Sequence, residues 1–432
     1  MSDVAEEIRR TFPKSVQPGL PKIKPVPAGS KRYTFGQLFD VIQRPVSLND
    51  LKEYDLVTVK RARGGIERRA TMKGSQVAVK SQFYLSEGDF LISKRQIVHG
   101  ACGIVSADFS GSIVSNEYSV LRCKPELDLQ YLGYLSYSVY FQQTCFHSSI
   151  GVHIEKMIFK LGDWFKWPIN LPSLPEQKKI AAFLGVVDAK IAALRARVLG
   201  LETYKRGLMQ ALFSQRLRFT KPDGTAFPDW EEKRLGEVFD WVKTNSLSRE
   251  FLNYEAGNVQ NIHYGDIHTK FSANFAQCQE QAPFVNDGAL LKDFSDEEYC
   301  QIGDVVIADA SEDYADIGKA IEIVQVRERT LVAGLHTYIA RPKSKMVALG
   351  FAGYLFRTPT MRKQIMRIAQ GVSVLGISKP NLSKLELHLP HPDEQQKIAD
   401  ALVAMDTKIA AVSAQVAQMQ AFKKGLLQQM FV

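Results

Sequence analysis

Basic residues gather in one stretch of the first half of the chain, with a spacing that suits contact with DNA. Most surround the flexible pair Gly64-Gly65 and two follow further along: Lys60, Arg61, Arg63, Arg68, Arg69, Lys73, Lys94 and Arg95. Lysine and arginine bind backbone phosphates, and arginine can also bind guanine through two hydrogen bonds in the major groove. We therefore predict a glycine-hinged, arginine-rich hairpin tip that binds DNA. A solvated basic hairpin would have the same composition.

A second candidate contact region lies in the other half of the chain, in the segment NVQNIHYGDIHTKF at 258–271. It carries amide, imidazole, phenol and ammonium groups around a glycine that we interpret as a turn, and such groups bind base edges. The candidate contacts are Asn261, His263, Tyr264, His268 and Lys270. An ordinary loop and strand would look similar, so this pattern is the less specific of the two.

The motifs of the enzymes that act on DNA are missing from the sequence. There is no Asn- or Asp-Pro-Pro-aromatic loop and no Gly-rich cofactor turn, as a base methyltransferase has, and no GxxxxGK[ST] loop for ATP. The carboxylates and lysine at 229–233 resemble a nuclease site, but we interpret this connector as a solvated linker. The spacing of Cys145, His147 and His153 matches no established zinc pattern. We predict no catalytic residue and no metal site.

Composition narrows the class of protein. The 432 residues suffice for two or three domains, and a formal charge of +9 is compatible with a polyanionic partner, although many basic proteins bind no nucleic acid. Five cysteines without a CxxC pair favour a reducing compartment. The N-terminus lacks an apolar signal segment, and no window approaches the run of about eighteen apolar residues of a membrane helix. We predict a cytoplasmic protein without membrane attachment.

The elements that position these residues emerge from an internal repeat. The segment 171–213 returns at 389–431 with a constant offset of 218 residues, and 20 of the 43 aligned positions are identical. Fainter similarities surround it, since residues 31–40 resemble 231–240 and the triplet Gly133-Tyr134-Leu135 resembles Gly353-Tyr354-Leu355. The chain is therefore an internal duplication, in which each half is a domain of about 150 residues followed by a repeat segment.

Both repeat segments have the apolar spacing of a long coiled-coil helix, with intervals of four and three residues. The predicted seam is Ile180, Leu184, Val187, Ile191, Leu194 and Val198 in the first copy, and Ile398, Leu402, Met405, Ile409, Val412 and Val416 in the second. Each helix should start after a proline, Pro175 or Pro392, and its roughly 38 residues would span close to 60 Å. Because the chain holds two matching copies, we expect them to pair with each other, antiparallel. Pairing of each helix with another molecule would bury the same apolar stripe.

Between the repeats the sequence predicts mixed α/β (α+β) domains. Runs typical of strands occur at 54–60, 75–85, 88–94, 303–309 and 335–341, and a helix is expected before each Gly-Val pair at 151–152 and 371–372. The predicted architecture is two similar globular domains separated by two long antiparallel coiled-coil helices, with a pseudo-twofold repeat. Its segments are a leader at 1–30, a first domain at 31–172, a central helix at 173–219, a second domain at 220–390 and a C-terminal helix at 391–432.

The repeat residues resemble a known family. The pattern LPxxxEQxxIAxxL, followed by DxKIAA and ending in K[RK]GLxQ, is similar to the conserved regions of the specificity subunits of Type I restriction-modification systems. The segments NIHYGDIHTKF at 261–271 and FPDWEEKRLGEV at 227–238 also resemble that family. The first domain departs from it, because KRYTFGQLFD at 31–40 lacks a preceding Trp and follows a basic, Pro-rich leader.

The resemblance implies a non-catalytic, sequence-specific DNA-binding subunit. Each globular domain would be a target recognition domain for one half of a bipartite double-stranded DNA target, and the helices would set the spacing between the halves. Two modification (methyltransferase) subunits would dock on this chain, and restriction (motor-nuclease) subunits would complete the complex. S-adenosylmethionine, ATP and Mg would belong to those partners, with no cofactor in this chain.

A non-enzymatic scaffold that joins two protein-binding modules through a coiled coil is the alternative. Such a scaffold would show neither DNA affinity that falls steeply with salt nor discrimination between sequences. A stand-alone nuclease is a third interpretation, and it would require metal-dependent cleavage by the purified chain.

Overall fold

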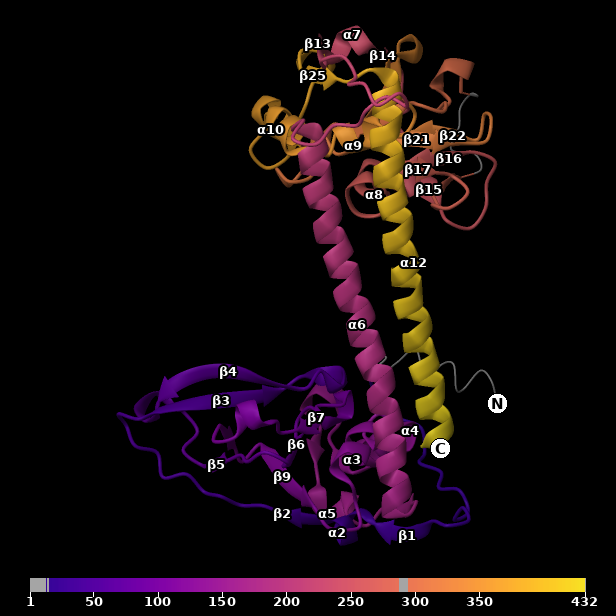
Figure 1. The fold of residues 1–432 in the computed structure, drawn as a ribbon. Coiled ribbons are helices and arrows are strands. Elements are labelled where there is room, and N and C mark those ends of the chain that lie inside the picture. The colour runs from indigo at the N-terminus through magenta and orange to yellow at the C-terminus, as the bar shows by residue number, and fades with distance from the viewer. Residues whose placement is uncertain (1–12, 14, 287–293, 432) are drawn as a thin grey trace. The chain divides into compact units, whose positions relative to one another are not determined.

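The computed structural model describes residues 13, 15–286 and 294–431, which form two compact units. Unit 1 comprises the described residues up to Arg195 together with 414–431, and unit 2 comprises the described residues of 196–413. Each unit therefore contains one globular domain and one segment of each long helix (Figure 1).

The two repeat segments are long helices, as predicted. Helix α6 spans Leu174–Phe213 and helix α12 spans Pro392–Met430. Pro175 lies in the first turn of α6 and Pro392 begins α12, whereas the sequence placed both prolines just before the helices. Proline is tolerated there because the first N–H groups of a helix have no partner within the helix. All the predicted seam residues are buried or half-buried.

In unit 1 the start of α6 lies beside the end of α12. Ile180 and Leu184 share a core cluster with Leu427. One turn further along α6, Asp188 accepts a hydrogen bond of 2.5 Å from Lys423. The position on α12 falls as the position on α6 rises, so these two segments are antiparallel.

In unit 2 the end of α6 lies beside the start of α12 in the same sense. Lys205 donates a hydrogen bond of 2.5 Å to Asp406. Further along α6, Leu212 shares a core cluster with Ile398 and Leu402. Both units thus confirm antiparallel pairing within one chain.

Each unit ties its globular domain to the helix pair through one tyrosine. The hydroxyl of Tyr134 donates to Asp188 at 2.9 Å, and the hydroxyl of Tyr354 donates to Asp406 at 2.6 Å. The lysine that binds each aspartate also lies near the tyrosine ring, with its nitrogen 5.4 and 5.0 Å from the ring centre. The faint Gly-Tyr-Leu repeat therefore marks a contact that both units share.

A buried glutamine in the first turn of each helix fixes a neighbouring loop. Gln177 accepts a hydrogen bond from the backbone of Asp128 and donates to two backbone carbonyls. Gln395 makes the same three bonds, accepting from the backbone of Ala348. These hydrogen bonds explain why the glutamine recurs at the start of both repeat segments.

One sheet has the same strand order in both globular domains, and we call it the frame sheet. In unit 1 the order is β2 (Phe39–Val41), β9 (Tyr118–Cys123), β6 (Phe90–Ser93) and β7 (Cys102–Ile104). In unit 2 it is β14 (Phe239–Val242), β23 (Thr337–Pro342), β19 (Val305–Ala308) and β21 (Ala320–Gln325), with β17 (Asn274–Ala276) added at the edge. A two-stranded ladder accompanies each frame sheet, β1 (Lys31–Thr34) with β12 (Pro168–Leu171) and β13 (Glu231–Arg234) with β25 (Glu386–Leu389).

The second sheet of each domain differs between the units. Unit 1 has the order β4 (Ile66–Lys73), β3 (Glu53–Val59), β8 (Ile113–Ser115) and β5 (Gln82–Tyr84). Unit 2 has the order β15 (Leu252–Asn253), β18 (Phe284–Val285), β16 (Gln260–Ile262) and β22 (Leu331–Ala333). Of the predicted strand runs, only 75–85 is largely wrong. The segment 75–85 begins in a tight turn at Gly74. The Gly74 backbone packs so closely on Asn49 that a Cβ at position 74 would lie 2.2 Å from the Asn49 carbonyl oxygen.

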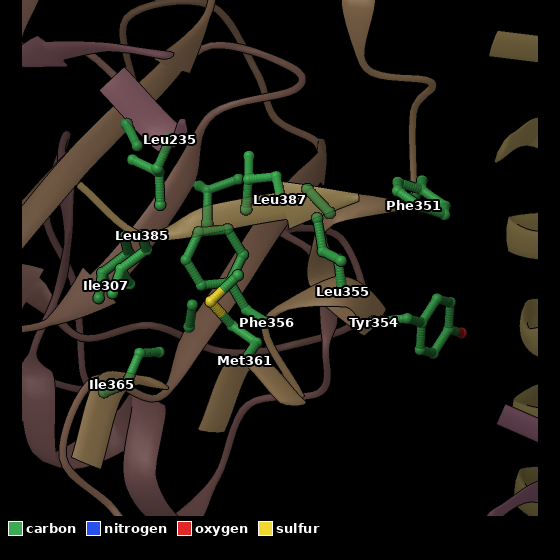
Figure 2. Packing of buried hydrophobic residues seen from close by; sticks show 14 of the residues in the cluster. Leu235, Ile307, Phe351, Tyr354, Leu355, Phe356, Met361, Ile365, Leu385 and Leu387 are labelled. Carbon is green, nitrogen blue, oxygen red and sulfur yellow. The ribbon is translucent and has the colours of Figure 1, made fainter. Parts of the chain in front are cut away.

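Each unit also contains several short helices. They are α2 (Phe35–Leu38), α3 (Leu129–Leu135), α4 (Val139–His147) and α5 (Leu161–Trp164) in unit 1, and α7 (Leu235–Val238), α8 (Tyr264–Thr269), α9 (Ala352–Leu355), α10 (Pro359–Ile368) and α11 (Lys379–Leu382) in unit 2. Helices α4 and α10 are the ones predicted before the Gly-Val pairs. Figure 2 shows Phe356, Met361 and Leu387 in the core of unit 2, with the Tyr354 hydroxyl directed away from them.

The described part of the leader packs on unit 1. Val16 is buried, the Ser15 hydroxyl lies 3.1 Å from the His99 ring, and Arg32 donates to the backbone carbonyl of Lys24 at 2.7 Å. In the part of the chain that is described, no helix has the length and apolar character needed to cross a membrane.

Candidate nucleic-acid interface

The basic segment of unit 1 forms the predicted hairpin. Strands β3 and β4 pair antiparallel from Glu53↔Lys73 to Val59↔Ile66, and Figure 1 shows them as a long ribbon. A 3-10 turn at Arg61–Arg63 leads into Gly65, whose φ of +84° lies in the left-handed region that favours glycine.

The glycine end of this hairpin packs against the domain and does not project from it. The Arg63 backbone N–H donates to Gly100 at 3.0 Å, and its guanidinium donates to the Ser136 carbonyl at 3.0 Å and lies 5.4 Å from the Tyr137 ring centre. Burial lowers the pKa of Arg63. Arg63 is half-buried and these contacts hold the hairpin against the domain, so the structure does not place it among the exposed cations, and its DNA contact stays a prediction.

The other predicted cations of unit 1 stay at the surface. Several have partners: Lys60 with Glu67 at 2.5 Å, Arg61 with Glu155 at 2.5 Å, Arg68 with Asp55 at 3.1 Å, Lys94 with the Asn116 carbonyl at 2.7 Å, and Arg95 with Glu117. Exposed ion pairs contribute little stability, so a phosphate can replace the carboxylate at small cost. Arg69 and Lys73 are exposed, and neither has an ionic partner among the residues that the structure describes.

A β-bulge presents two arginines together. The pairing shifts between Val57↔Arg68 and Leu56↔Ala70, which leaves Arg69 without a residue opposite it. Neighbours in a regular strand point to opposite faces, but a bulge changes the direction of a side chain. Both Arg68 and Arg69 are exposed, so the bulge places two cations next to each other on the surface of the hairpin.

A surface groove of about 780 Å³ lies beside Lys94. Gln43, Asn116, Lys160 and Lys166 also line it. The sequence prediction did not include these four residues, because they are spread along the chain and form no local basic cluster.

In unit 2 the predicted glycine turn is wrong, since Gly265 lies within helix α8. His263 caps this helix, and its Nδ1 accepts a hydrogen bond of 3.1 Å from the Gly265 N–H. Burial, and secondarily Arg249, lowers the pKa of His263 to about 4, so the ring is neutral at pH 7. Asn261 is fully buried in β16 and accepts a hydrogen bond from Asn245 at 2.9 Å. Asn261 and His263 are therefore buried residues that support this region through hydrogen bonds.

Tyr264 lies at the centre of an aromatic group in unit 2. Its ring stacks on His263 with centres 4.5 Å apart and meets His268 and His336 edge-on at 5.8 and 5.4 Å. Burial lowers the pKa of His268. His336, which the sequence prediction missed, is half-exposed, has a φ of +57° and lies 3.2 Å from Asp309. A strained backbone at an exposed polar residue often marks a functional site.

The ammonium of Lys270 is exposed and held in place. It lies 3.0 Å from the carboxylate of buried Asp266 and donates to the Tyr254 hydroxyl at 2.6 Å. Arg249 adds two hydrogen bonds of 2.9 Å to Asp266. Burial opposes ionisation of Asp266, but the hydrogen bonds from Arg249 and Lys270 outweigh it and lower its pKa. Arg249 and Tyr254 were missed because only the fold brings them to this carboxylate.

Within the described residues, no three or more His, Cys, Asp or Glu side chains are arranged to hold a metal ion. The candidate regions of the two related domains therefore carry cations, amides and aromatic rings, without a metal site among the described residues. These are the groups of a nucleic-acid-binding protein.

Comparison with known proteins gives the family. The model of the Type I restriction modification DNA specificity domain matches residues 27–202 and 228–418, once for each half. Because these matches cover most of the chain, the protein belongs to this family, and it is a DNA-sequence specificity subunit of the Type I restriction-modification class.

Individual relatives agree with this assignment. The chain is 26% identical over 313 residues to the Type I restriction enzyme MjaVIII specificity subunit of Methanocaldococcus jannaschii, covering 68% of both chains. It is also 26% identical over 272 residues to the putative MjaX specificity subunit of that organism, covering 60% of this chain and 57% of the relative.

Two solved structures share the fold. A chain from a study of complex assembly and conformational transition of the type I R-M system has a TM-score of 0.59 at 18% identity, covering 95% of this chain and 99% of that one. The HsdS subunit from Thermoanaerobacter tengcongensis has a TM-score of 0.53 at 18% identity, covering 94% and 98%.

Proposed function

We propose that each globular domain binds one half of a bipartite double-stranded DNA target and that the paired helices set the distance between the halves. The observation that carries this proposal is a duplicated frame sheet combined with two different second sheets. A common frame fits two equivalent tasks, and different second sheets fit two different half-site sequences. Bulge residues Arg68 and Arg69 would bind one half-site, and Tyr264, His268, Lys270 and His336 the other.

The chain would act without chemistry of its own, as the cytoplasmic DNA-binding part of a larger complex. Two modification subunits would dock on the helices and bring S-adenosylmethionine, and restriction subunits would bring ATP and Mg. Large apolar side chains that stay exposed on α6 and α12 support docking there, namely Phe183, Val186, Leu199, Tyr204 and Phe422. Exposed apolar side chains mark a surface that a partner covers when they form a contiguous patch, and the pairs on α6 are the candidates for such patches.

Selection from a random DNA library by the complex of this chain with its modification subunits tests the proposal. We expect two short specified sequences separated by a gap of constant length, and binding that weakens steeply with salt. A complex that shows no sequence preference would favour the scaffold interpretation.

A longer helix pair tests the spacing role. One heptad added to each helix, between Ala192 and Val198 and between Ala410 and Val416, keeps the apolar seam in register. Seven residues lengthen a helix by about 10 Å, so the preferred gap should grow by about three base pairs while both half-site sequences stay the same. The half-sites also rotate relative to each other by roughly a third of a turn, so affinity is expected to fall. A folded variant that still prefers the original gap would contradict the spacing role.

A further inference from the structure

Each unit presents one valine that is almost completely exposed at the tip of a short loop. Val152 follows Gly151 in unit 1, and Val372 follows Gly371 in unit 2. Their exposed fractions are 97% and 102%, the highest of the large apolar side chains that the structure describes. Single exposed apolar residues are common on protein surfaces. The recurrence of this one at matching positions of two domains is the feature that requires explanation.

The glycine before each valine lets the loop close tightly. A Cβ at Gly151 would lie 2.9 Å from the Met157 Cα, and a Cβ at Gly371 would lie 2.0 Å from the Val374 carbonyl oxygen. Gly371 also has a φ of +134°. Only glycine permits such close backbone approach, so the backbone itself holds each valine outward.

The two loops occupy the same place on the frame sheet. The N–H of Phe159, at the end of the first loop, donates to the Lys94 carbonyl at 2.9 Å, directly after β6. The N–H of Ile377, at the end of the second loop, donates to the Asp309 carbonyl at 2.9 Å, directly after β19. Strands β6 and β19 hold the same position in the strand order, so the two hydrogen bonds correspond.

Both loops adjoin the candidate DNA-contact residues of their own unit. In unit 1 the loop residue Glu155 binds Arg61 at 2.5 Å, and Ile158 lines the groove beside Lys94. In unit 2 the anchor residue Asp309 lies 3.2 Å from His336, whose ring contacts Tyr264. The residues after the valines differ, since HIEKM follows Val152 and SVLGI follows Val372. The position of the valine recurs although its surroundings do not.

We propose that Val152 and Val372 each contact a base edge in one half-site through their methyl groups. This inference rests on the proposed function and names residues for it. A valine side chain has no charge and no hydrogen-bonding group, so any contact that it makes with DNA is apolar. The apolar group that a base pair presents in the major groove is the C5 methyl of thymine. Each valine therefore favours thymine at one position of its half-site, beside cationic or aromatic residues that bind other groups.

Single truncations in the complete complex with modification subunits test this proposal. Val152→Ala and Val372→Ala each remove two methyl groups, and a fully buried methyl group corresponds to about fourfold in affinity. We expect a loss of between about 4-fold and 15-fold, confined to one half-site for each variant. In the random-library selection, the preference for thymine should disappear at one position of that half-site. Uracil at that position should weaken the parent complex but not the alanine variant.

Val26→Ala is the matched control, because Val26 is 44% exposed and lies in the leader, away from both loops in sequence. It should leave both half-site preferences unchanged. If the parent complex selects a bipartite sequence but Val152→Ala and Val372→Ala select it with unaltered affinity and base preference, the loop inference is wrong and the proposed function stands. If the parent complex selects no sequence, the proposed function itself fails.

Discussion

The two units share their frame sheet and their attachment to the long helices, but they differ in the second sheet. The shared contacts come from repeated residues, such as Tyr134 and Tyr354 at the helix pair. Apart from the two Gly-Val loops, the candidate DNA contacts come from parts that do not correspond, an arginine-bearing bulge in unit 1 and a histidine-capped helix in unit 2. The two units thus attach to the helices through the same residues, whereas most of their candidate DNA contacts are different residues.

The correspondence also fails at one buried position of the frame sheet. Ile104 pairs with Phe90 in unit 1, and Glu322 pairs with Val305 at the equivalent place in unit 2. The Glu322 carboxylate accepts hydrogen bonds from the backbone N–H groups of Gly350 and Gly353, at 2.7 and 2.9 Å. The side chain at this position is therefore apolar in unit 1 and ionisable in unit 2.

A second difference lies at the start of each long helix. Glu394 of α12 is fully buried and binds Arg218 from the connector after α6, at 3.1 and 2.8 Å. Its repeat partner Glu176, in the first turn of α6, is exposed. The same glutamate thus belongs to the core of one unit and to the surface of the other.

The largest effect should follow from breaking this buried ion pair. Arg218→Ala leaves Glu394 buried and uncompensated, which should lower the free energy of unfolding of unit 2 by about 3–5 kcal/mol. Hydrogen exchange of the α12 amides, combined with denaturant unfolding, measures the loss in unit 2. Arg216→Ala is the control, because Arg216 is exposed, and it should cost no more than about 0.5 kcal/mol. If both variants lowered the free energy of unfolding equally, the buried ion pair would not distinguish unit 2 from unit 1.

The buried carboxylate should make the stability of unit 2 depend on pH. Burial raises the pKa of Glu322 from 4.5 to about 7, although backbone N–H groups bind its charged form. The folded state therefore binds this proton more tightly than the unfolded state does. Its stabilising contribution is complete below about pH 4.5 and is lost as the pH rises through about 7, at a cost of up to about 3 kcal/mol.

Glu322→Gln, which cannot ionise, provides the comparison. The unfolding free energies of the parent and of this variant are measured from pH 5 to pH 8.5. The value for the parent, relative to that of the variant, should fall as the pH rises. Glu255→Gln, at an exposed position of the same unit, should run parallel to the parent. A pH-independent difference for Glu322→Gln would show that the carboxylate does not titrate in this range.

The shared parts could be predicted from the sequence because their signals are local or repeated. The apolar spacing of α6 and α12 and the 218-residue offset predicted both helices and their pairing. The unshared parts depend on tertiary contacts, which no local pattern reports. Arg63 and Arg69 look alike in the sequence, yet one is enclosed by Ser136 and Tyr137 and the other is exposed at a bulge.

The candidate contact region of unit 2, at 258–271, was harder to predict from the sequence for the same reason. Gly265 suggested a turn, but His263 caps a helix there, and histidine is not among the preferred N-cap residues. His336 and Arg249 reach this region only through strand pairing and loop packing, so spacing along the chain could not reveal them. A residue type thus predicts what a side chain can bind, and the fold decides whether that side chain is exposed.

The smallest of these effects concerns DNA binding by unit 1. Replacing Arg68 and Arg69 with alanine removes two exposed cations and only one surface ion pair, so the fold should keep its stability to within about 0.5 kcal/mol. Binding to the half-site of unit 1 should weaken by about 1 kcal/mol, and by up to about 3 kcal/mol if either arginine binds a guanine. If the arginines bind phosphates alone, the slope of log affinity against log salt should fall by about one for each phosphate that is no longer neutralised, without a change in base preference.

Arg63→Ala tests whether a residue of the same hairpin supports the fold without binding DNA. Because the half-buried Arg63 donates to the Ser136 carbonyl, its removal should destabilise unit 1 and weaken binding only through that destabilisation. Lys270→Ala provides the comparison in unit 2 and should affect the other half-site alone. If the double variant Arg68→Ala/Arg69→Ala binds both half-sites with the affinity and salt dependence of the parent, the exposed bulge is a solvated surface. DNA binding by unit 1 would then have to come from the groove beside Lys94 and the loop that carries Val152.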